Sequence, residues 1–279
     1  MVIRKLAQRT KDGVDRLNKN QDDQQRRIIA DWLSPAEYAS QQDDFRNHRQ
    51  KGTGEWLLNS QEYQSWHNGT RQTLFCPGIP GAGKTMIASI VIDNLLSDFE
   101  ADPETGIAYL YCSYKSRAEQ NLENLMSSLL RQLTQEQPVL DVDLANLYER
   151  HAQKNSRPSS YEISRVLHST TRSYSRTFVV IDALDECTNS DNTRDRLLTE
   201  IFGLQTKSPS KIYLFATSRF IPEVTNKFKD CMELEIRAAD EDVERYIEGQ
   251  ISRLPSCVSR KADLHDEIKT GIIQAVDGM

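Results

Sequence analysis

One stretch of the sequence restricts the possible folds more than any other: Gly78-Ile79-Pro80-Gly81-Ala82-Gly83-Lys84-Thr85. It fits G-x-x-x-x-G-K-[ST], the pattern of a phosphate-binding loop. Glycines let such a loop turn tightly and point several backbone N–H groups at one anion, and the helix that follows adds its positive dipole end. Lys84 can then reach the β- and γ-phosphates of a nucleotide, while the Thr85 hydroxyl can ligate Mg²⁺. We predict a nucleotide site that includes Gly78, Ile79, Pro80, Gly81, Ala82, Gly83, Lys84, Thr85 and Met86.

The residues around this loop supply the context that the pattern requires, a strand before it and a helix after it. Residues 71–76 are a short β-prone run that ends at Pro77. After the loop, apolar residues recur at the spacing of one helical face: Ile87, Ile90, Val91 and Leu95. The order of strand, loop and helix therefore favours a nucleotide site over a glycine-rich turn without a ligand.

Strands and helices alternate along the rest of the chain. Apolar runs of strand length occur at 106–114, 177–182 and 211–216, with a weaker edge strand at 232–236. Helical patterns lie between them, at 118–135, 139–154, 160–174 and 192–205. Such alternation means parallel pairing with right-handed crossovers and helices on both faces of the sheet. We therefore predict an α/β fold, a P-loop NTPase three-layer sandwich with a mainly parallel sheet.

Composition along the chain suggests three parts. Residues 1–50 are a helical lead-in and connector, residues 51–237 form the nucleotide-binding domain, and residues 238–279 begin a helical subdomain. Serine residues mark expected helix starts at Ser34, Ser60 and Ser160. Two tryptophans, Trp56 and Trp66, stand before the first strand. We expect them to be packing anchors, because Trp favours burial, and a position beside the nucleotide base is the alternative.

Two further polar motifs directly follow predicted strands. Asp182 ends the apolar run 178–181, which is the place of a carboxylate that holds Mg²⁺ beside a phosphate loop. Asp185 and Glu186 come next and could polarise an attacking water, with a solvated turn as the alternative. Arg219 could bind a terminal phosphate through two N–H groups, with a surface loop as the alternative. We predict that Asp182 joins Thr85 at the metal and that Asp185, Glu186 and Arg219 are catalytic, since strand ends share one edge of a parallel sheet.

Charge and composition weigh against several classes of function. The net charge of −6 gives no overall basic surface for nucleic acid, although residues 1–30 are basic. No apolar run approaches the ~18 residues that cross a bilayer, and the N-terminus has no apolar signal core. The five cysteines are widely spaced without a C-x-x-C pair, which favours reduced, mostly buried thiols. We expect a soluble cytoplasmic protein that binds no nucleic acid and has no membrane span.

Taken together, these motifs resemble those of a NACHT domain, a signal-transducing P-loop NTPase of the STAND class. The small Ala183 after Asp182, with the acidic pair two residues further on, is typical of NACHT domains. The lead-in also resembles the nephrocystin-3-like N-terminal NACHT group, which is abundant in fungal NOD-like receptors. That part of the resemblance rests on Asp31-Trp32-Leu33-Ser34-Pro35, on Gly52-Thr53-Gly54-Glu55-Trp56-Leu57-Leu58, and on Cys76-Pro77 before the loop.

The resemblance implies a switch that holds ADP when closed, exchanges it for ATP, and opens to oligomerise. It also implies an N-terminal effector domain, C-terminal repeats, and a winged-helix part that contacts the nucleotide. Because the sequence stops at Met279, we expect a truncated helical subdomain and a module without those flanking parts. The expected partners are nucleotide, further copies of the chain, and other signalling proteins.

Three functions stay open on the sequence. We favour a NACHT-type module that binds ATP or ADP with Mg²⁺ and hydrolyses ATP slowly. An AAA+-like ATPase with fast turnover would need an arginine finger from a neighbouring subunit, and a non-hydrolysing scaffold would use the fold only for protein contacts. The base favoured is adenine, because Asn226-Lys227-Phe228-Lys229-Asp230 misses the N-K-x-D pattern that reads guanine.

Overall fold

The computed structural model describes residues 23–34, 38–135, 137, 140–187, 191–251, 265 and 267–272. At the centre of this described part is a five-stranded sheet in the order β2-β3-β4-β1-β5, in which every neighbouring pair is parallel. The strands are β1 (Thr73–Pro77), β2 (Thr105–Tyr111), β3 (Arg176–Asp182), β4 (Lys211–Ser218) and β5 (Met232–Glu233). The predicted α/β fold of P-loop NTPase type, with its mainly parallel sheet, is confirmed.

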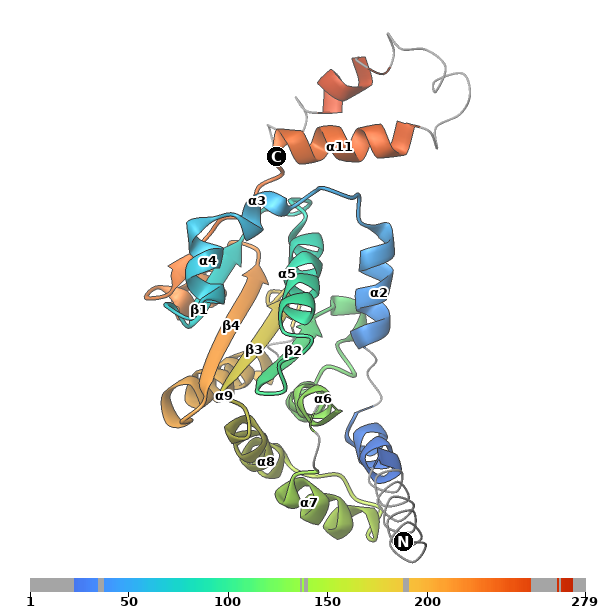
Figure 1. Cartoon of the computed structure of the whole chain (residues 1–279), viewed down its shortest axis with the longest axis vertical. Coiled ribbons are helices and arrows are strands. Elements are labelled where there is room, and N and C mark those ends of the chain that lie inside the picture. The colour runs from blue at the N-terminus through green and yellow to red at the C-terminus, as the bar shows by residue number, and fades with distance from the viewer. Residues whose placement is uncertain are drawn as a thin grey trace, which may run out of the picture.

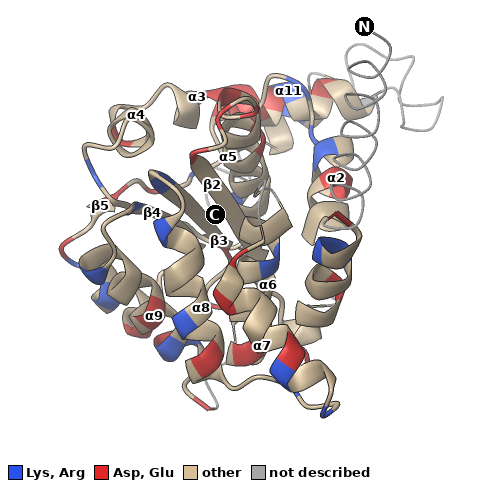
Figure 2. Cartoon of the chain, turned by 60° about the horizontal axis from the view of Figure 1, so that its bottom comes forward, with Lys and Arg blue, Asp and Glu red and all other residues tan. Residues whose placement is uncertain are grey.

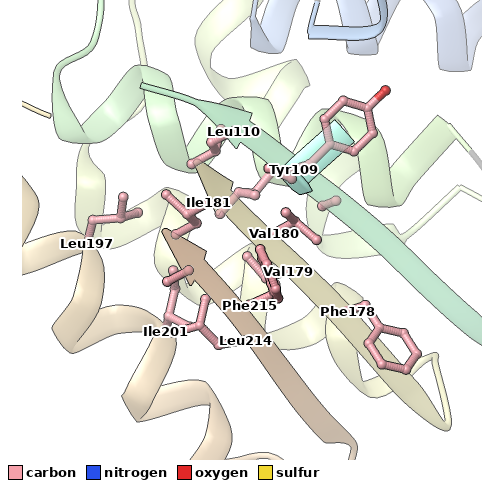
Figure 3. Close-up of a cluster of buried hydrophobic side chains, with 14 of the residues drawn as sticks. Tyr109, Leu110, Phe178, Val179, Val180, Ile181, Leu197, Ile201, Leu214 and Phe215 are labelled. Atoms are coloured by element: carbon pink, nitrogen blue, oxygen red, sulfur yellow. The ribbon is translucent and has the colours of Figure 1, made fainter. Parts of the chain in front are cut away.

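The inner strands are apolar nearly throughout, which suits strands that are covered on both faces. Residues 178–181 of β3 are each 3% exposed or less. Figure 3 shows their side chains among those of β2 and β4, with Leu197 and Ile201 of α9 (Thr193–Lys207) next to Ile181 and Leu214. Burial of this much apolar surface fixes the strands relative to one another, and it therefore also fixes where each strand ends.

Helices pack around the sheet (Figure 1). α5 contacts β2, β3 and β4, α6 contacts β2, and α9 contacts β4. Figure 1 places α6, α7 and α8 together at one end of the molecule and α11 at the other. Besides α9, the helices are α2 (Tyr38–His48), α3 (Glu55–Leu58), α4 (Gln61–His67), α5 (Lys84–Asp98), α6 (Leu122–Gln135), α7 (Val142–Ala152), α8 (Ser160–Arg172), α10 (Pro222–Thr225) and α11 (Asp240–Ile251), with short 3-10 turns at Tyr114–Ser116 and Asn226–Phe228.

Four predicted boundaries were wrong by three or four residues: the start of α7, the end of β5, and the two between β2 and α6. The strand ends at Tyr111 and the helix begins only at Leu122. The Gln120 side chain explains the early end of the strand, because its amide donates to the Tyr111 carbonyl oxygen and accepts from the Ser113 N–H, each at 3.0 Å. These bonds replace the ladder bonds of a longer strand, and the chain then turns away from the sheet.

Helix caps show a second difference from the sequence prediction. Ser60 caps α4, as predicted, by accepting from the Tyr63 N–H at 3.1 Å. The cap of α8 is Ser159 rather than the predicted Ser160, because Ser159 and Glu162 form a reciprocal capping box. The helix start predicted after Ser34 falls at 35–37, outside the described residues.

The lead-in lies against the domain. A helix at 23–33 carries Trp32, whose ring packs edge-on to Tyr148 of α7 with centroids 5.3 Å apart. In α2, the buried Gln42 donates to the Ser89 carbonyl oxygen of α5 at 3.0 Å. The lead-in is therefore joined to α5 and α7, while the predicted division of the chain at residue 50 stays a prediction.

The tryptophan and cysteine predictions can be compared with the core. Trp66 is 0% exposed and lies edge-on to Phe178, which confirms it as a packing anchor. Trp56 is half-buried. The cysteines of the described part are unbridged: Cys76, Cys112 and Cys187 are buried and Cys231 is half-buried. Cys257 lies outside the described residues.

Charged residues of both signs are interspersed along α7, α8 and α9, as Figure 2 shows. Within the part of the chain that the structure describes, no helix is long and apolar enough to cross a membrane.

Candidate functional site

The phosphate-binding loop joins β1 to α5, which begins at Lys84. Gly81 and Gly83 have φ angles of +84° and +86°, a left-handed conformation that favours glycine, and a Cβ on either would meet nothing within 4 Å. Gly78 differs, because a Cβ there would lie 2.5 Å from the carbonyl oxygen of Ile236. The loop is therefore pressed against the chain after β5 on one side and open on the other.

Lys84 lies over this loop. Its Nζ donates to the carbonyl oxygens of Gly78 at 2.9 Å and Ile79 at 2.7 Å. Burial lowers the pKa of Lys84, while the carboxylates of Asp185 and Asp182 oppose that shift. The ammonium group is thus held between the loop and the acidic residues at the sheet edge, where the sequence predicts a phosphate contact.

Asp182 ends β3 beneath the loop, and its side chain joins three segments. One carboxylate oxygen accepts from Thr85 Oγ1 at 2.7 Å, and the other accepts from Thr217 Oγ1 at 2.6 Å. The residue is 2% exposed, and burial raises the pKa of its carboxyl group, although the two hydroxyl donors lower it. The predicted metal ligands Thr85 and Asp182 are therefore in direct contact.

Asp185 and Arg219 form an ion pair at the same edge of the sheet. The Arg219 backbone N–H and its Nε donate to the two carboxylate oxygens of Asp185, at 2.9 and 2.5 Å. The Asp185 side chain is 2% exposed and that of Arg219 is 48% exposed, and the pair raises the pKa of Arg219. The structure brings these two predicted catalytic residues together, but it uses the carboxylate of one to hold the other.

Glu186 is more open than its neighbour. Its carboxylate accepts from the Tyr114 backbone N–H at 3.2 Å, an exposed contact. Its own backbone N–H donates to the Ala183 carbonyl oxygen at 2.8 Å, which closes a turn in which Ala183 has a φ of +55°. A non-glycine residue in this conformation is uncommon, and the turn gives Asp185 and Glu186 different surroundings although they are adjacent in sequence.

A cavity of about 830 Å³ opens beside the loop. Its wall includes residues of the lead-in, the loop, the segment after β5, and α11, among them Trp56, Ile79, Met86, Arg237, Val243 and Tyr246. Two contacts join residues 52–54, which follow the lead-in, to α11 across it. The Gly54 N–H donates to Asp242 Oδ2 at 2.8 Å, and Arg245 donates to the Gly52 carbonyl oxygen at 2.5 Å. Trp56 borders this cavity and also packs against the core, so its position beside a nucleotide base stays a prediction.

The sequence predictions missed two parts of this arrangement. Thr217 directly follows the predicted strand 211–216 and is not among the predicted site residues, yet its hydroxyl donates to Asp182 and also accepts from the Ala183 N–H at 2.9 Å. A hydroxyl residue at the carboxyl end of a strand next to Asp182 was the available signal. The cavity wall on α11 had no comparable signal, because its residues follow an ordinary amphipathic helix pattern.

Comparison with known proteins agrees with these motifs. A family model described as "Nephrocystin 3, N-terminal" matches residues 52–219, which include the loop, Asp182 and Arg219. The chain belongs to this family. Vegetative incompatibility protein HET-E-1 of Podospora anserina is 25% identical over 226 residues, which are 77% of this chain and 16% of that protein. The predicted resemblance to the nephrocystin-3-like NACHT group is confirmed. The matched part of this chain spans 16% of the length of HET-E-1.

Two solved structures are similar at a low level. A DNA replication initiation factor has a TM-score of 0.44 at 14% identity, over 81% of this chain and 60% of that one. The Aeropyrum pernix ORC1 protein, solved in complex with DNA, has a TM-score of 0.44 at 15% identity, over 67% of this chain and 45% of that one. Similarity of this degree indicates no ligand or partner for the present chain.

Proposed function

We propose that the chain is a NACHT-type module that binds ATP or ADP with Mg²⁺ and hydrolyses ATP slowly, as a switch in signalling. The observation that carries the proposal is the contact of Thr85 with Asp182 beneath an open phosphate loop. A hydroxyl and a buried carboxylate at this place are the hard oxygen ligands that Mg²⁺ prefers.

The residues fit a magnesium nucleotide. Thr85 and Asp182 would hold the metal, and Asp182 is kept in one orientation by Thr217. Lys84 and the backbone N–H groups around Gly81 and Gly83 would bind the phosphates, because the loop offers open space and positive charge together. When bound, Mg²⁺ neutralises charge on the phosphate oxygens.

Slow hydrolysis is favoured over fast turnover by the ion pair of Asp185 with Arg219. Both oxygens of Asp185 accept from Arg219, and the Asp185 side chain is only 2% exposed, so we expect a water to reach this carboxylate only when the ion pair opens. Glu186 is the freer carboxylate and the better candidate for polarising water. A scaffold without hydrolysis would need neither Lys84 over the loop nor Thr85 in contact with Asp182.

An adenine base fits better than guanine. The first three residues of the near match to the guanine pattern, Asn226–Phe228, form a short 3-10 turn. Phe228 is buried there, and Lys227 pairs with Asp195 of α9 at 3.5 Å. None of them lines the cavity beside the loop. That cavity, with Trp56 and Tyr246 in its wall, is the proposed place of the base.

Self-association or contact with other signalling proteins follows from the same proposal, because a switch acts through its partners. The proposed place of action is the cytoplasm. The family relationship and the kinship with a vegetative incompatibility protein support this proposal.

Titration with nucleotide tests the proposal. We expect ATP and ADP to bind with higher affinity in the presence of Mg²⁺, and we expect Lys84→Ala to weaken binding by roughly 10- to 100-fold, the cost of one charged hydrogen-bond donor. Lys211→Ala is the matched control, since Lys211 is exposed at the opposite end of β4. Binding that is absent, or equally strong in Lys84→Ala, would reject the function, and mass spectrometry of co-purified nucleotide would identify the base.

A further inference from the structure

A buried glutamine connects the lead-in to the helix that leaves the phosphate loop. Gln42 and Tyr38 are the two buried residues of α2. Figure 1 shows α2 alongside α5, and the two helices are in contact. Helices on a domain surface usually turn apolar side chains toward the core, so an amide at this buried position is unusual.

Every hydrogen-bonding group of the Gln42 amide has a partner. Its Nε2 donates to the Ser89 carbonyl oxygen at 3.0 Å and to Asp93 Oδ1 at 2.7 Å, both in α5. Its Oε1 accepts from the hydroxyl of Tyr111, the last residue of β2. Ser89 and Tyr111 are buried like Gln42 itself. One side chain of α2 therefore binds α5 and β2 at the same time.

Two neighbours on α2 contact the same partners. Arg46 donates to Asp93 Oδ1 through Nε at 3.0 Å and through Nη2 at 2.6 Å, in an exposed setting. The Phe45 ring packs on the Tyr111 ring with centroids 4.8 Å apart. Exposed ion pairs contribute little and apolar contacts are not directional, whereas a buried hydrogen-bond network requires each partner in a fixed place. Gln42 is therefore the residue that sets the position of α5 relative to β2.

Both partners of Gln42 lead to the proposed metal ligands. Ser89 lies one helical turn after Thr85 in α5. Tyr111 of β2 lies opposite Asp182 of β3 in the strand register. The Thr85 hydroxyl donates to the Asp182 carboxylate, so a shift of α5 relative to β2 would move one ligand away from the other.

We propose that Gln42 is a positioning residue for Mg²⁺, which holds the Thr85 hydroxyl next to the Asp182 carboxylate by fixing α5 to β2. The inference rests on the proposed function. Mg²⁺ demands near-ideal octahedral geometry, whereas a lysine binds phosphate as a point charge on a flexible stem. Loss of the Gln42 bonds should therefore weaken the part of nucleotide affinity that depends on the metal, and leave the part that depends on Lys84.

Calorimetric titration of the full chain with ATP, in Mg²⁺ and in EDTA, tests the inference. The ratio of the dissociation constant in EDTA to that in Mg²⁺ measures how much the metal adds to affinity. We expect Gln42→Met to lower this ratio at least about fivefold, the scale of a coupling through packed elements. The constant in EDTA should stay within about twofold of that of the unaltered chain.

Gln41→Met is the matched control, because Gln41 precedes Gln42 on the same helix and is exposed. It should leave both dissociation constants unchanged. An unaltered ratio in Gln42→Met, or an equal loss in Mg²⁺ and in EDTA, would overturn the positioning role.

A second variant separates position from stability. Gln42→Met leaves the Tyr111 hydroxyl without its acceptor, which should lower the midpoint of urea denaturation. Adding Tyr111→Phe removes that hydroxyl, and the midpoint should then return toward that of the unaltered chain. The metal ratio should stay low in the double variant, because the bonds that fix α5 to β2 are still missing. Recovery of the ratio together with the midpoint would show that Gln42 acts on stability alone, and it would overturn the inference.

The unaltered chain distinguishes this inference from the proposed function. If it binds no nucleotide in Mg²⁺ or in EDTA, the proposed function fails, and the positioning role fails with it. If it binds ATP more tightly in Mg²⁺ and Gln42→Met does the same to the same degree, the function stands and only the role of Gln42 is refuted.

Discussion

On the sheet side of the phosphate loop, Asp182 is 2% exposed and accepts hydrogen bonds from Thr85 and Thr217. On the α11 side, Asp242 in the cavity wall accepts a partly buried hydrogen bond from the Gly54 backbone N–H, and Tyr246 in that wall is 53% exposed. Buried polar networks cost much to open, whereas contacts open to water can be exchanged for it. The two sides of one proposed site therefore differ in how firmly they are held.

This difference matches the chemistry expected on each side. Phosphate and metal need oxygen ligands in fixed positions, and the ends of packed strands supply them. A base needs a cavity that can admit it, and a wall held by few contacts allows that. If the sheet side is held more firmly than the α11 side, substitutions on the sheet side should reduce nucleotide binding more than substitutions on the α11 side.

The largest effect is expected from Asp182→Ala. The substitution removes the buried carboxylate from the proposed metal site and leaves the hydroxyls of Thr85 and Thr217 without an acceptor. We expect the Mg²⁺-dependent affinity for ATP to fall roughly 100-fold, as for the loss of a buried charged group, measured by calorimetric titration at several Mg²⁺ concentrations.

Glu235→Ala is the matched control, since it removes a carboxylate from the cavity wall, where Glu235 pairs with the exposed Arg237. Its expected effect on affinity is less than about threefold, the scale of an exposed ion pair. Equal losses in Asp182→Ala and Glu235→Ala would remove the distinction between the two sides.

A smaller effect is expected from Thr217→Val. The valine keeps the shape but leaves Asp182 without one donor and the Ala183 N–H without its acceptor. We expect a loss of about 1–3 kcal/mol in the free energy of unfolding and roughly tenfold in Mg²⁺-dependent affinity, with both restored in Thr217→Ser. Chemical denaturation and the same titration measure the two quantities.

Thr177→Val provides the contrast at the other end of β3. Thr177 is 0% exposed, and its hydroxyl has no hydrogen-bond partner among the described residues. Removing that hydroxyl should leave stability unchanged or raise it, because a buried group without a partner costs free energy. If Thr177→Val lowers the free energy of unfolding as much as Thr217→Val does, the hydrogen bonds of Thr217 at Asp182 contribute no more to stability than a hydroxyl without a partner.

The sequence predicted the sheet side because its signals are local. Each inner strand is an apolar run, and its first polar residue marks the edge where Lys84, Asp182 and Arg219 meet. The partner of Thr217 could not be predicted in the same way. It depends on the register of β3 with β4, in which Ile181 lies opposite Ala216, and packing of the whole sheet sets that register.

The α11 side could not be predicted for a related reason. The hydrogen bond between Gly54 and Asp242 joins residues that are 188 positions apart. The sequence around each of them contains no pattern that predicts a contact with the other. A local prediction was also wrong by one residue, since Ser159 rather than Ser160 caps α8. Adjacent serines are chemically equal in sequence, and only the backbone path decides which one stands before the helix.

The smallest effect is expected from Asp242→Ala, on the side held by few contacts. The alanine removes the acceptor for the Gly54 N–H, whereas Asp242→Asn keeps an acceptor and removes only the charge. Comparing the two variants separates the hydrogen bond from the repulsion that a carboxylate exerts on phosphates. We expect Asp242→Ala to bind ATP no more than about fivefold more weakly than Asp242→Asn, the scale of one partly exposed hydrogen bond. A difference close to that of Asp182→Ala would show that α11 is as firmly set as the sheet edge, and the contrast between the two sides would then fail.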